Sequence, residues 1–340
     1  MRSRRTLYAG LALLLVAPAI TAALWHRRTS EAEEAVLRAA TAHERVGYWG
    51  QAAWRKEKWS RRVDIRHDAR TGATHYRWNG KPYVLSRPSS RSSDPAAWCL
   101  DAEAVEQNYR ARLTGTGRYL GRATRHLVLE PRHDGRPTVH LDIDRATDLP
   151  LKVTTIRPDG SLYRVCAFRK LEIGPQDVTA PQRSGRRSWR GRSVSPTELP
   201  YEAGFRPLLP DHLPEGFRLR SCRVVDWMGG SVRVSYTDGV TVFELHEYRV
   251  LTPAELEHML TRKMGARRAR HRLRRIAEMQ WRRLIRDESV GGGVTVGRHR
   301  RSRHTTYRLR VDDVEVTLSA RSDLAEAEVL NVIRSLRPVD

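Results

Sequence analysis

Eight runs with strand character between residues 47 and 173 constrain the fold more than any other feature of this sequence. They cover residues 47–59, 61–67, 73–78, 81–86, 118–130, 137–144, 149–157 and 161–173. Turn signals such as Asn79-Gly80 and Pro158-Asp159-Gly160 separate neighbouring runs, as they do in β-hairpins. We therefore predict a mainly antiparallel sheet over this part of the chain.

The run at 137–144 shows what such a sheet requires of the rest of the chain. Its side chains alternate between apolar and polar, so one face of the strand is apolar. Helices or a second sheet must cover that face. Residues 31–46, with Ser30 as the N-cap, and residues 101–112 have helical character. We expect these two helices to cover the sheet in an α+β fold.

A stretch rich in Gly, Pro, Ser and Arg at residues 175–200 has the composition of a linker. A second unit follows at residues 201–340. Its strand runs cover residues 217–225, 231–236, 240–250, 294–297, 304–311 and 314–320. Residues 253–286 and 323–336 have helical character, so we predict a smaller C-terminal α+β domain.

An apolar segment of 19 residues from Leu7 to Trp25 follows three arginines at the start of the sequence. A basic start, an apolar stretch and small residues near its end describe a secretory signal peptide. A membrane-spanning helix needs about 20 residues, so a retained anchor formed by residues 7–25 is the alternative. We expect residues 1–28 to be a signal peptide or anchor. The chain would then lie in the periplasm or at the outer face of the cytoplasmic membrane.

The chain carries 62 Lys and Arg against 39 Asp and Glu, a formal net charge of +23. Such a balance favours anionic membranes, acidic proteins or nucleic acid as partners. The basic residues are spread along the chain and export separates it from DNA, so we expect no nucleic-acid partner. The basic helical stretch at 252–290 is a candidate contact for a protein partner or anionic lipid, with a solvated helix face as the alternative. Its candidate residues are Arg267, Arg268, Arg270, Arg272, Arg274 and Arg275.

The apolar face of the first sheet is a second candidate site. A curved sheet with one apolar face can hold acyl chains or an apolar peptide, and each Å² of apolar surface buried contributes about 25 cal/mol. The alternative is that the same side chains form an ordinary domain core. The candidate residues are Leu127, Leu129, Val139, Leu141, Ile143, Leu151 and Val153.

The sequence contains none of the short motifs that accompany hydrolase, metalloprotease or nucleotide-binding sites. His140, Asp142 and Asp144 alternate along one strand, but no further ligands accompany them, so we expect a polar face and no metal. We also expect no cofactor and no catalytic residues. We expect the three cysteines to be isolated thiols that pack as small apolar groups, and one disulfide between two of them is the alternative.

Several short motifs follow one another in a characteristic order along both units. In the first unit they are Tyr48-Trp49-Gly50, Gly121-Arg122, Leu127-Val128-Leu129-Glu130-Pro131-Arg132, Leu141-Asp142-Ile143-Asp144-Arg145, Leu149-Pro150-Leu151-Lys152, Phe168 and Leu171-Glu172-Ile173-Gly174. In the second unit they are Leu213-Pro214-Glu215-Gly216-Phe217 and Tyr236-Thr237-Asp238-Gly239. The order of these motifs, over about residues 35–250, resembles the MucB/RseB family, which regulates an envelope-stress sigma factor from the periplasm.

The resemblance implies that residues 31–174 form a half-open antiparallel β-barrel with helices in its mouth, similar to the lipoprotein carriers LolA and LolB. It also implies a regulator that binds the outer part of a membrane-spanning anti-sigma factor and responds to a lipid or lipopolysaccharide-type ligand. A LolA-like carrier of lipoproteins or lipids is the alternative. The basic stretch at 252–290 departs from the family pattern.

Overall fold

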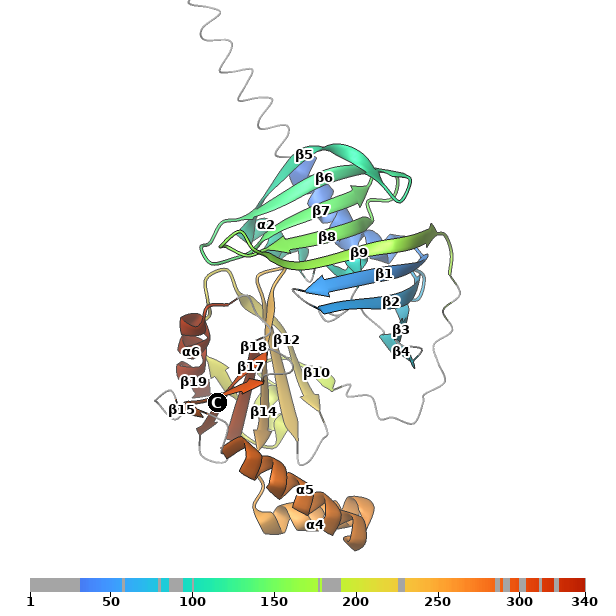
Figure 1. The fold of residues 1–340 in the computed structure, drawn as a ribbon. Helices are drawn as coiled ribbons and strands as arrows, with labels where there is room; N and C mark the ends of the chain where they lie inside the picture. The colour runs from blue at the N-terminus through green and yellow to red at the C-terminus, as the bar shows by residue number, and fades with distance from the viewer. Residues whose placement is uncertain are drawn as a thin grey trace, which may run out of the picture. The chain divides into compact units, whose positions relative to one another are not determined.

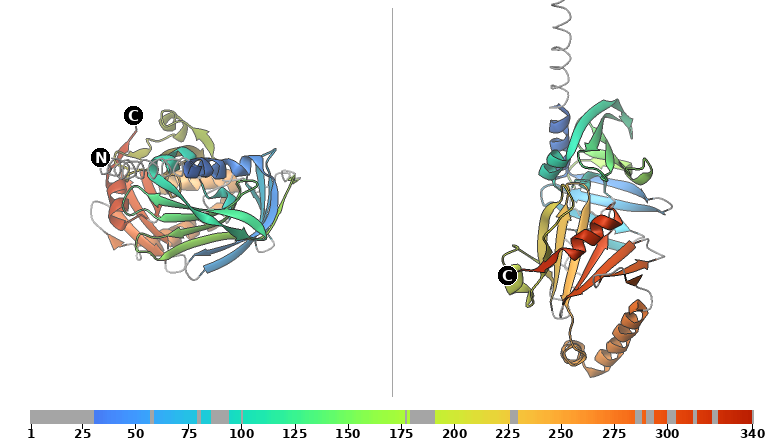
Figure 2. Two further views of the ribbon diagram at one scale, coloured as in Figure 1. Left: turned by 90° about the horizontal axis from the view of Figure 1, so that it is seen from above. Right: turned by 90° about the vertical axis from the view of Figure 1, so that its left-hand side faces the viewer.

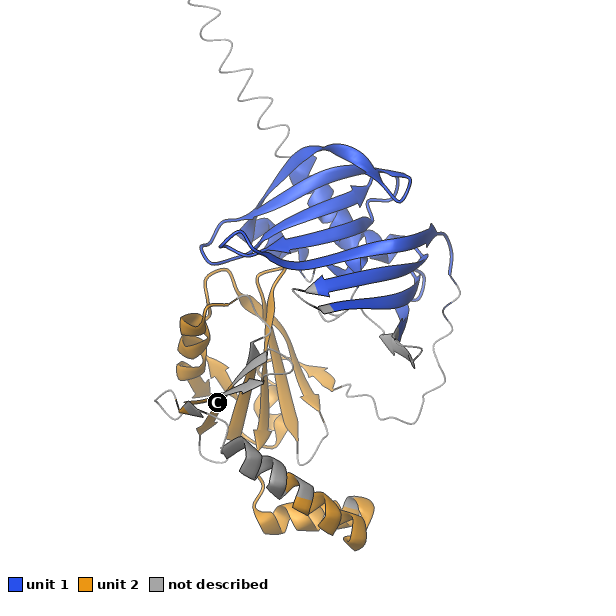
Figure 3. Cartoon of the chain, viewed as in Figure 1, with its two compact units in different colours: residues 1–180 blue, residues 181–340 orange. Residues whose placement is uncertain are grey.

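The computed structural model divides the chain into two compact units, residues 1–180 and residues 181–340 (Figure 3). The structure describes residues 31–56, 59–78, 81–85, 94–99, 101–176, 178, 191–225, 230–284, 288–289, 294–299, 304–311, 314–320 and 324–339. The segment Leu7–Trp25, the predicted N-cap Ser30 and the Asn79-Gly80 turn lie outside these residues. Within them, no helix is long and apolar enough to cross a membrane.

The first unit is built on one sheet of nine strands in the order β4-β3-β2-β1-β9-β8-β7-β6-β5 (Figure 1). All neighbours pair antiparallel. In the described residues β4 and β5 are the two edges and do not pair with each other, which confirms the half-open sheet. The strands are β1 Tyr48–Lys56, β2 Trp59–Asp68, β3 Ala73–Trp78, β4 Lys81–Leu85, β5 Tyr109–Tyr119, β6 Arg122–Pro131, β7 Thr138–Asp144, β8 Pro150–Ile156 and β9 Leu162–Ile173.

The described part of this unit also contains a helix over residues 31–45, the 3-10 helix η1 Pro95–Ala97 and α2 Ala102–Asn108. The prediction that a helix extends to residue 112 is wrong. From Tyr109 the side chains alternate between buried and exposed, so the chain continues as strand β5. The sequence contains a local indication of this change, because the apolar Tyr109 and Ala111 alternate with Arg110 and Arg112. In the structure the first two are buried and the two arginines are exposed.

The predicted strand at 118–130 is also wrong at its start, because it includes the turn between β5 and β6. That turn contains Leu120 with φ 51° and Gly121 with φ 76°. Two successive residues with positive φ are typical of a tight hairpin turn. Leucine rarely adopts this conformation, so an apolar residue at position 120 does not indicate a turn in the sequence.

The second unit contains an eight-stranded sheet in the order β10-β12-β13-β14-β18-β17-β16-β15 and a small sheet of β11 and β19. Its strands are β10 Arg192–Val194, β11 Leu208–Pro210, β12 Arg218–Val225, β13 Ser231–Thr237, β14 Val242–Arg249, β15 Glu288–Ser289, β16 Val294–His299, β17 His304–Val311, β18 Val314–Ala320 and β19 Leu336–Pro338. Its helices are α3 Leu199–Ala203, α4 Pro253–Met264, α5 Ala266–Leu284 and α6 Glu326–Arg334.

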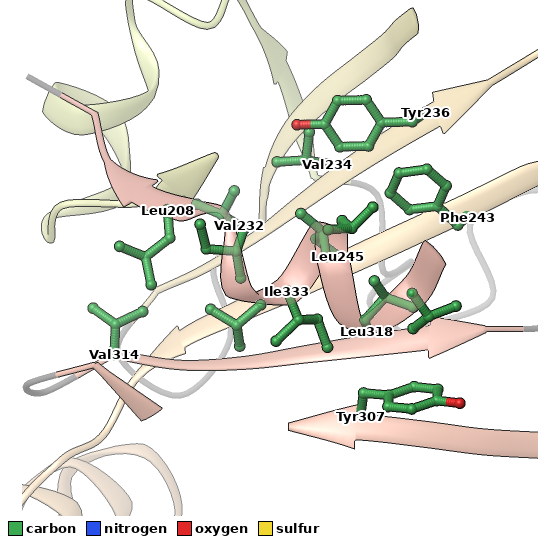
Figure 4. Packing of buried hydrophobic residues seen from close by; sticks show 14 of the residues in the cluster. Leu208, Val232, Val234, Tyr236, Phe243, Leu245, Tyr307, Val314, Leu318 and Ile333 are labelled. Carbon is green, nitrogen blue, oxygen red and sulfur yellow. The ribbon is translucent and has the colours of Figure 1, made fainter. Parts of the chain in front are cut away.

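The core of the second unit lies between this sheet and α6, whose Val332 and Ile333 are buried (Figure 4). Tyr236 and Phe243 stack with ring centroids 4.9 Å apart. The predicted linker at 175–200 lies partly outside the described residues. Its described part contains β10 and the start of α3, where Leu199 is buried in the same core. Those residues therefore contribute to the packing of the second unit.

The three cysteines are free thiols. Cys166 is buried on β9 of the first unit and Cys222 is buried on β12 of the second, while Cys99 is partly exposed. Burial raises the pKa of the Cys222 thiol to about 11, and burial likewise raises that of Cys166. Both buried thiols are therefore protonated at neutral pH and pack as small apolar groups.

A buried carboxyl group lies in the core of the second unit. Glu247 on β14 is fully buried, and its Oε2 accepts a hydrogen bond of 2.6 Å from the backbone N–H of Leu208. Its Oε1 has no hydrogen-bond partner among the residues that the structure describes. Burial raises the pKa of Glu247 to about 8, so the side chain holds a proton at neutral pH.

The substitution Glu247→Gln should remove a pH dependence of stability. The folded protein holds a proton on Glu247 that the unfolded chain releases, so the free energy of unfolding should fall by roughly 1 kcal/mol per pH unit between pH 5 and 8. Glutamine cannot titrate, so the variant should gain stability relative to the wild type as the pH rises. Hydrogen exchange of the β13 and β14 amides across this range measures the effect.

The matched control is Glu257→Gln, which removes an exposed carboxyl group from α4. Its stability should follow the wild type at every pH. If the free energy of unfolding varied with pH in the same way for the wild type and Glu247→Gln, Glu247 would be ionised in the folded protein.

Candidate functional site

The seven predicted cavity residues lie on one face of the first sheet. The register pairs Leu127 with Leu141 and Leu141 with Val153, which forms a row across β6, β7 and β8. A second row pairs Leu129 with Val139. All seven side chains are 2% exposed or less, so this face is fully covered.

The helix over residues 31–45 lies across this face (Figure 2). Ala32, Ala35, Ala39 and Ala42 are each 0% exposed, and their spacing places them on one side of the helix. Ala42 belongs to the same core cluster as Leu151. Because alanine has the smallest apolar side chain, the helix backbone can lie close to the strands.

A shallow hollow remains at one end of the covered face. Its walls include Val36 and Leu37 of the helix, Tyr109 of β5 and Leu129 of β6. Its volume is about 10 Å³, which is about the space that one water molecule needs. The covered face thus has no room for an acyl chain at this point unless the helix moves. We name the helix over residues 31–45 the covering helix.

Buried polar groups fix the C-terminal part of the covering helix to the sheet. His67 on β2 hydrogen-bonds through Nδ1 to Thr74 Oγ1 at 2.8 Å and through Nε2 to the backbone carbonyl of His43 on the helix. A carbonyl oxygen only accepts, so Nε2 carries the proton and Nδ1 accepts from the threonine hydroxyl. Burial lowers the pKa of His67 and of His43, which favours this neutral form at neutral pH.

A second buried polar group holds the segment that follows β4. The Tyr48 hydroxyl donates a hydrogen bond of 2.6 Å to Asp94 Oδ2, and the N–H of Ala96 donates one of 3.0 Å to Oδ1. Burial raises the pKa of Asp94 to about 6, although these hydrogen bonds oppose the rise.

Asp94 is not among the functional residues that the sequence predicts. The available signal was local, since Asp94 precedes Pro95 and this pair is typical of a helix N-cap followed by its first residue. The role of Tyr48 had no such signal. Its ring packs against Phe168 with centroids 5.7 Å apart and against His67 at 5.1 Å, and these partners are distant in sequence.

The opposite face of the sheet carries paired charges. His126 Nδ1 lies 2.6 Å from Asp142 Oδ1, and Lys152 Nζ lies 3.6 Å from Asp142 Oδ2. Arg122 donates two hydrogen bonds of 3.0 Å to Asp144. His140 is exposed beside them, and the described residues contain no group of three metal-ligating side chains. The carboxylates of this face are therefore engaged by cations of the chain itself.

The predicted basic residues lie on α5 of the second unit. Arg267, Arg268, Arg270 and Arg274 are exposed and Arg272 is half-buried. The structure does not describe the side chain of Arg275. The four exposed arginines lie on more than one side of the helix, since Arg267, Arg270 and Arg274 are in line and Arg268 is about a quarter turn away.

Residues 61–193 match the family model of the MucB/RseB N-terminal domain. Among solved structures, MucB in the Pseudomonas aeruginosa MucA/MucB complex is 20% identical, with a TM-score of 0.53 over 91% of this chain and 99% of that one. A crystal structure of MucB is 19% identical, with a TM-score of 0.54 over 91% and 98% of the two chains. MucB in complex with MucA(peri) is 20% identical, with a TM-score of 0.51 over 90% and 98%. No curated protein matches the chain. The likeness shows that this chain shares the MucB fold across both units.

The substitution Tyr48→Phe should destabilise the first unit in a pH-dependent way. It keeps the ring but removes a donor to Asp94, so the pKa of Asp94 should rise further. The free energy of unfolding should fall by about 1–2 kcal/mol at pH 7.5 and by less at pH 5, where Asp94 is protonated. Urea unfolding at the two pH values measures this difference.

Tyr201→Phe is the control, because Tyr201 of the second unit is 88% exposed. It should change the stability at neither pH. A loss for Tyr48→Phe that is equal at both pH values would contradict an ionised Asp94 as the cause.

Proposed function

We propose that this chain, whose residues 61–193 carry a MucB/RseB N-terminal domain, is an envelope regulator that binds a membrane-spanning anti-sigma factor. The observation that carries the proposal is the MucB fold, which extends over both units and matches MucB solved together with MucA. The absence of a catalytic motif in the sequence is consistent with a binding role.

The same proposal places the chain outside the cytoplasm. The segment from Leu7 to Trp25, preceded by arginines, supports export to the periplasmic side of the membrane. If residues 7–25 are retained as an anchor, the two units are tethered next to a membrane-spanning partner. Tethering raises the effective concentration of the partner without any new contact.

The covered apolar face supplies a route by which a lipid ligand would regulate this binding. An acyl chain reaches Leu127, Leu141 or Val153 only when the covering helix moves, since these side chains are 2% exposed or less. Each CH₂ group that is then buried contributes about 0.8 kcal/mol. A ligand that binds only the open form shifts the equilibrium between the forms, and it alters partner affinity if the partner distinguishes them.

The alternative function is a LolA-like carrier of lipoproteins or lipids. The specific observation in its favour is the same covered apolar face, which would accept an acyl chain as cargo. The two functions differ in what they do with the ligand. A carrier transfers lipidated cargo from one membrane to another, whereas a regulator stays bound to a membrane protein and changes its affinity for it.

Site-specific crosslinking in the native envelope tests the regulatory function. We expect the crosslinked partner to be a single-span membrane protein whose cytoplasmic part binds a sigma factor. Addition of lipopolysaccharide should reduce the crosslinked fraction. Recovery of cytoplasmic proteins alone would overturn both the function and the export, and recovery of lipidated cargo alone would favour the carrier.

The substitution Ala39→Leu tests whether the covering helix must move. A leucine at this fully buried position overpacks the contact with the sheet, which should lower the free energy of unfolding by about 1–3 kcal/mol. It should also favour the open form, so the affinity for a fluorescent fatty acid should rise by about tenfold. Fluorescence titration of the probe measures this affinity.

Glu44→Leu is the matched control, because it adds a leucine to the exposed side of the same helix. Its affinity for the probe should equal that of the wild type. If Ala39→Leu loses stability but binds the fatty acid no more tightly, the helix does not act as a cover for a lipid site.

A further inference from the structure

A helical hairpin of α4 and α5 projects from one end of the sheet in the second unit (Figures 1 and 2). Helix α4 begins at a capping box formed by Thr252 and Glu255, and Gly265, whose φ is +80°, caps its C-terminal end. Glycine adopts this conformation without steric cost, so the chain turns here and continues as α5. The hairpin is therefore a defined structural element with its own start and turn.

The two helices of the hairpin pack against each other along a narrow apolar strip. Leu260 of α4 is 3% exposed and Ala269 of α5 is 0% exposed. Leu273 and Ile276 of α5 are half-buried and lie on the same side of the helix as Ala269, by their spacing of four and seven residues. The apolar side of α5 is thus turned inward.

The other side of α5 carries a basic stripe that faces solvent. Its members are spaced by three and four residues, which places them in line along the helix. At 1.5 Å per residue the stripe is roughly 10 Å long. The members are Arg267, Arg270, His271 and Arg274, all exposed.

The hairpin carries a large excess of positive charge. Residues 253–284 contain ten Lys and Arg against three Asp and Glu, a net charge of +7. Among the described residues, none of Arg267, Arg270 and Arg274 forms an ion pair with a carboxylate. By contrast, Arg122 pairs with Asp144 in the first unit, and Arg249 pairs with Glu255 at the base of the hairpin.

We propose that the basic stripe of α5 binds the surface of an anionic phospholipid bilayer. Guanidinium groups pair with phosphate oxygens through two parallel hydrogen bonds, and basic amphipathic helices bind anionic membranes. This interaction surface goes beyond the proposed function, because it lies in the second unit and requires neither the covered apolar face nor an anti-sigma factor.

Two features favour a bilayer over an acidic protein as the occupant. The basic side chains extend beyond one line, since Arg262 of α4 and Arg268 of α5 are also exposed. Such a spread suits many mobile phosphates on a broad surface better than one peptide. The exposed Met264, at the tip of the hairpin beside this charge, offers an apolar group that can enter the headgroup layer.

Vesicle flotation of the full chain tests this proposal. The variant Arg267→Gln, Arg270→Gln, Arg274→Gln removes three charges and keeps good helix formers. The control Arg62→Gln, Arg66→Gln, Arg145→Gln removes three exposed arginines from the first unit. Each protein is mixed with vesicles of phosphatidylcholine alone or with about 30% phosphatidylglycerol, at an ionic strength of about 0.1 M.

We expect the anionic lipid to strengthen binding of the wild type and of the control variant alike. The affinity of the hairpin variant for the anionic vesicles should be roughly a hundredfold lower than that of the wild type, at about fivefold per arginine. The apolar segment from Leu7 to Trp25 and the arginines beside it are present in all three proteins, so their contribution on each vesicle type is the same for the three proteins. Higher salt should weaken the gain.

Hydrogen exchange of the amides in residues 266–274 on the two vesicle types provides a second measurement. It locates the contact even if the apolar segment holds all three proteins on neutral vesicles. Equal binding and equal exchange for the wild type and the hairpin variant would overturn the proposal. Binding of polyglutamate but not of anionic vesicles by the stripe would overturn it in favour of an acidic protein partner.

Discussion

The close packing of an alanine-faced helix on the apolar side of a nine-stranded sheet is the contact on which the first unit depends. Ala35, Ala39 and Ala42 are fully buried and leave little space between helix and strands. Alanine also loses no side-chain entropy when it is buried. The sheet face under the helix carries larger side chains. Leucine, isoleucine and valine residues of β6, β7 and β8 pack there against the small alanines of the helix.

The polar groups under the covering helix determine how firmly it is held. His67 hydrogen-bonds the backbone carbonyl of His43 in the helix, whereas the buried bond between Tyr48 and Asp94 holds the segment that follows β4. Buried hydrogen bonds of this kind are costly to break, because each separated group loses its partner away from water. The bond from His67 therefore holds the C-terminal part of the covering helix to β2, while the hollow lies beside Val36 and Leu37 in its middle.

The sequence predicted those parts of the structure that depend on local pattern. The alternation in residues 137–144 identified the buried face of β7 correctly, because side chains in a strand point to opposite sides in turn. The start of β5 was misassigned because a short helix and a strand meet at Tyr109 without a proline or glycine between them. The bond from Tyr48 to Asp94 spans 46 residues, and no local pattern indicates a contact at such a distance.

The hairpin of α4 and α5 leaves the sheet after β14 and returns at β15, which is an edge strand of the same sheet. Strand β14 pairs directly with β18, and the core cluster of the second unit includes none of the hairpin residues that the structure describes. Substitutions in the hairpin therefore leave the core packing that stabilises the domain unchanged. Natural selection can change the length and charge of this element in related proteins while the domain beneath it keeps its stability.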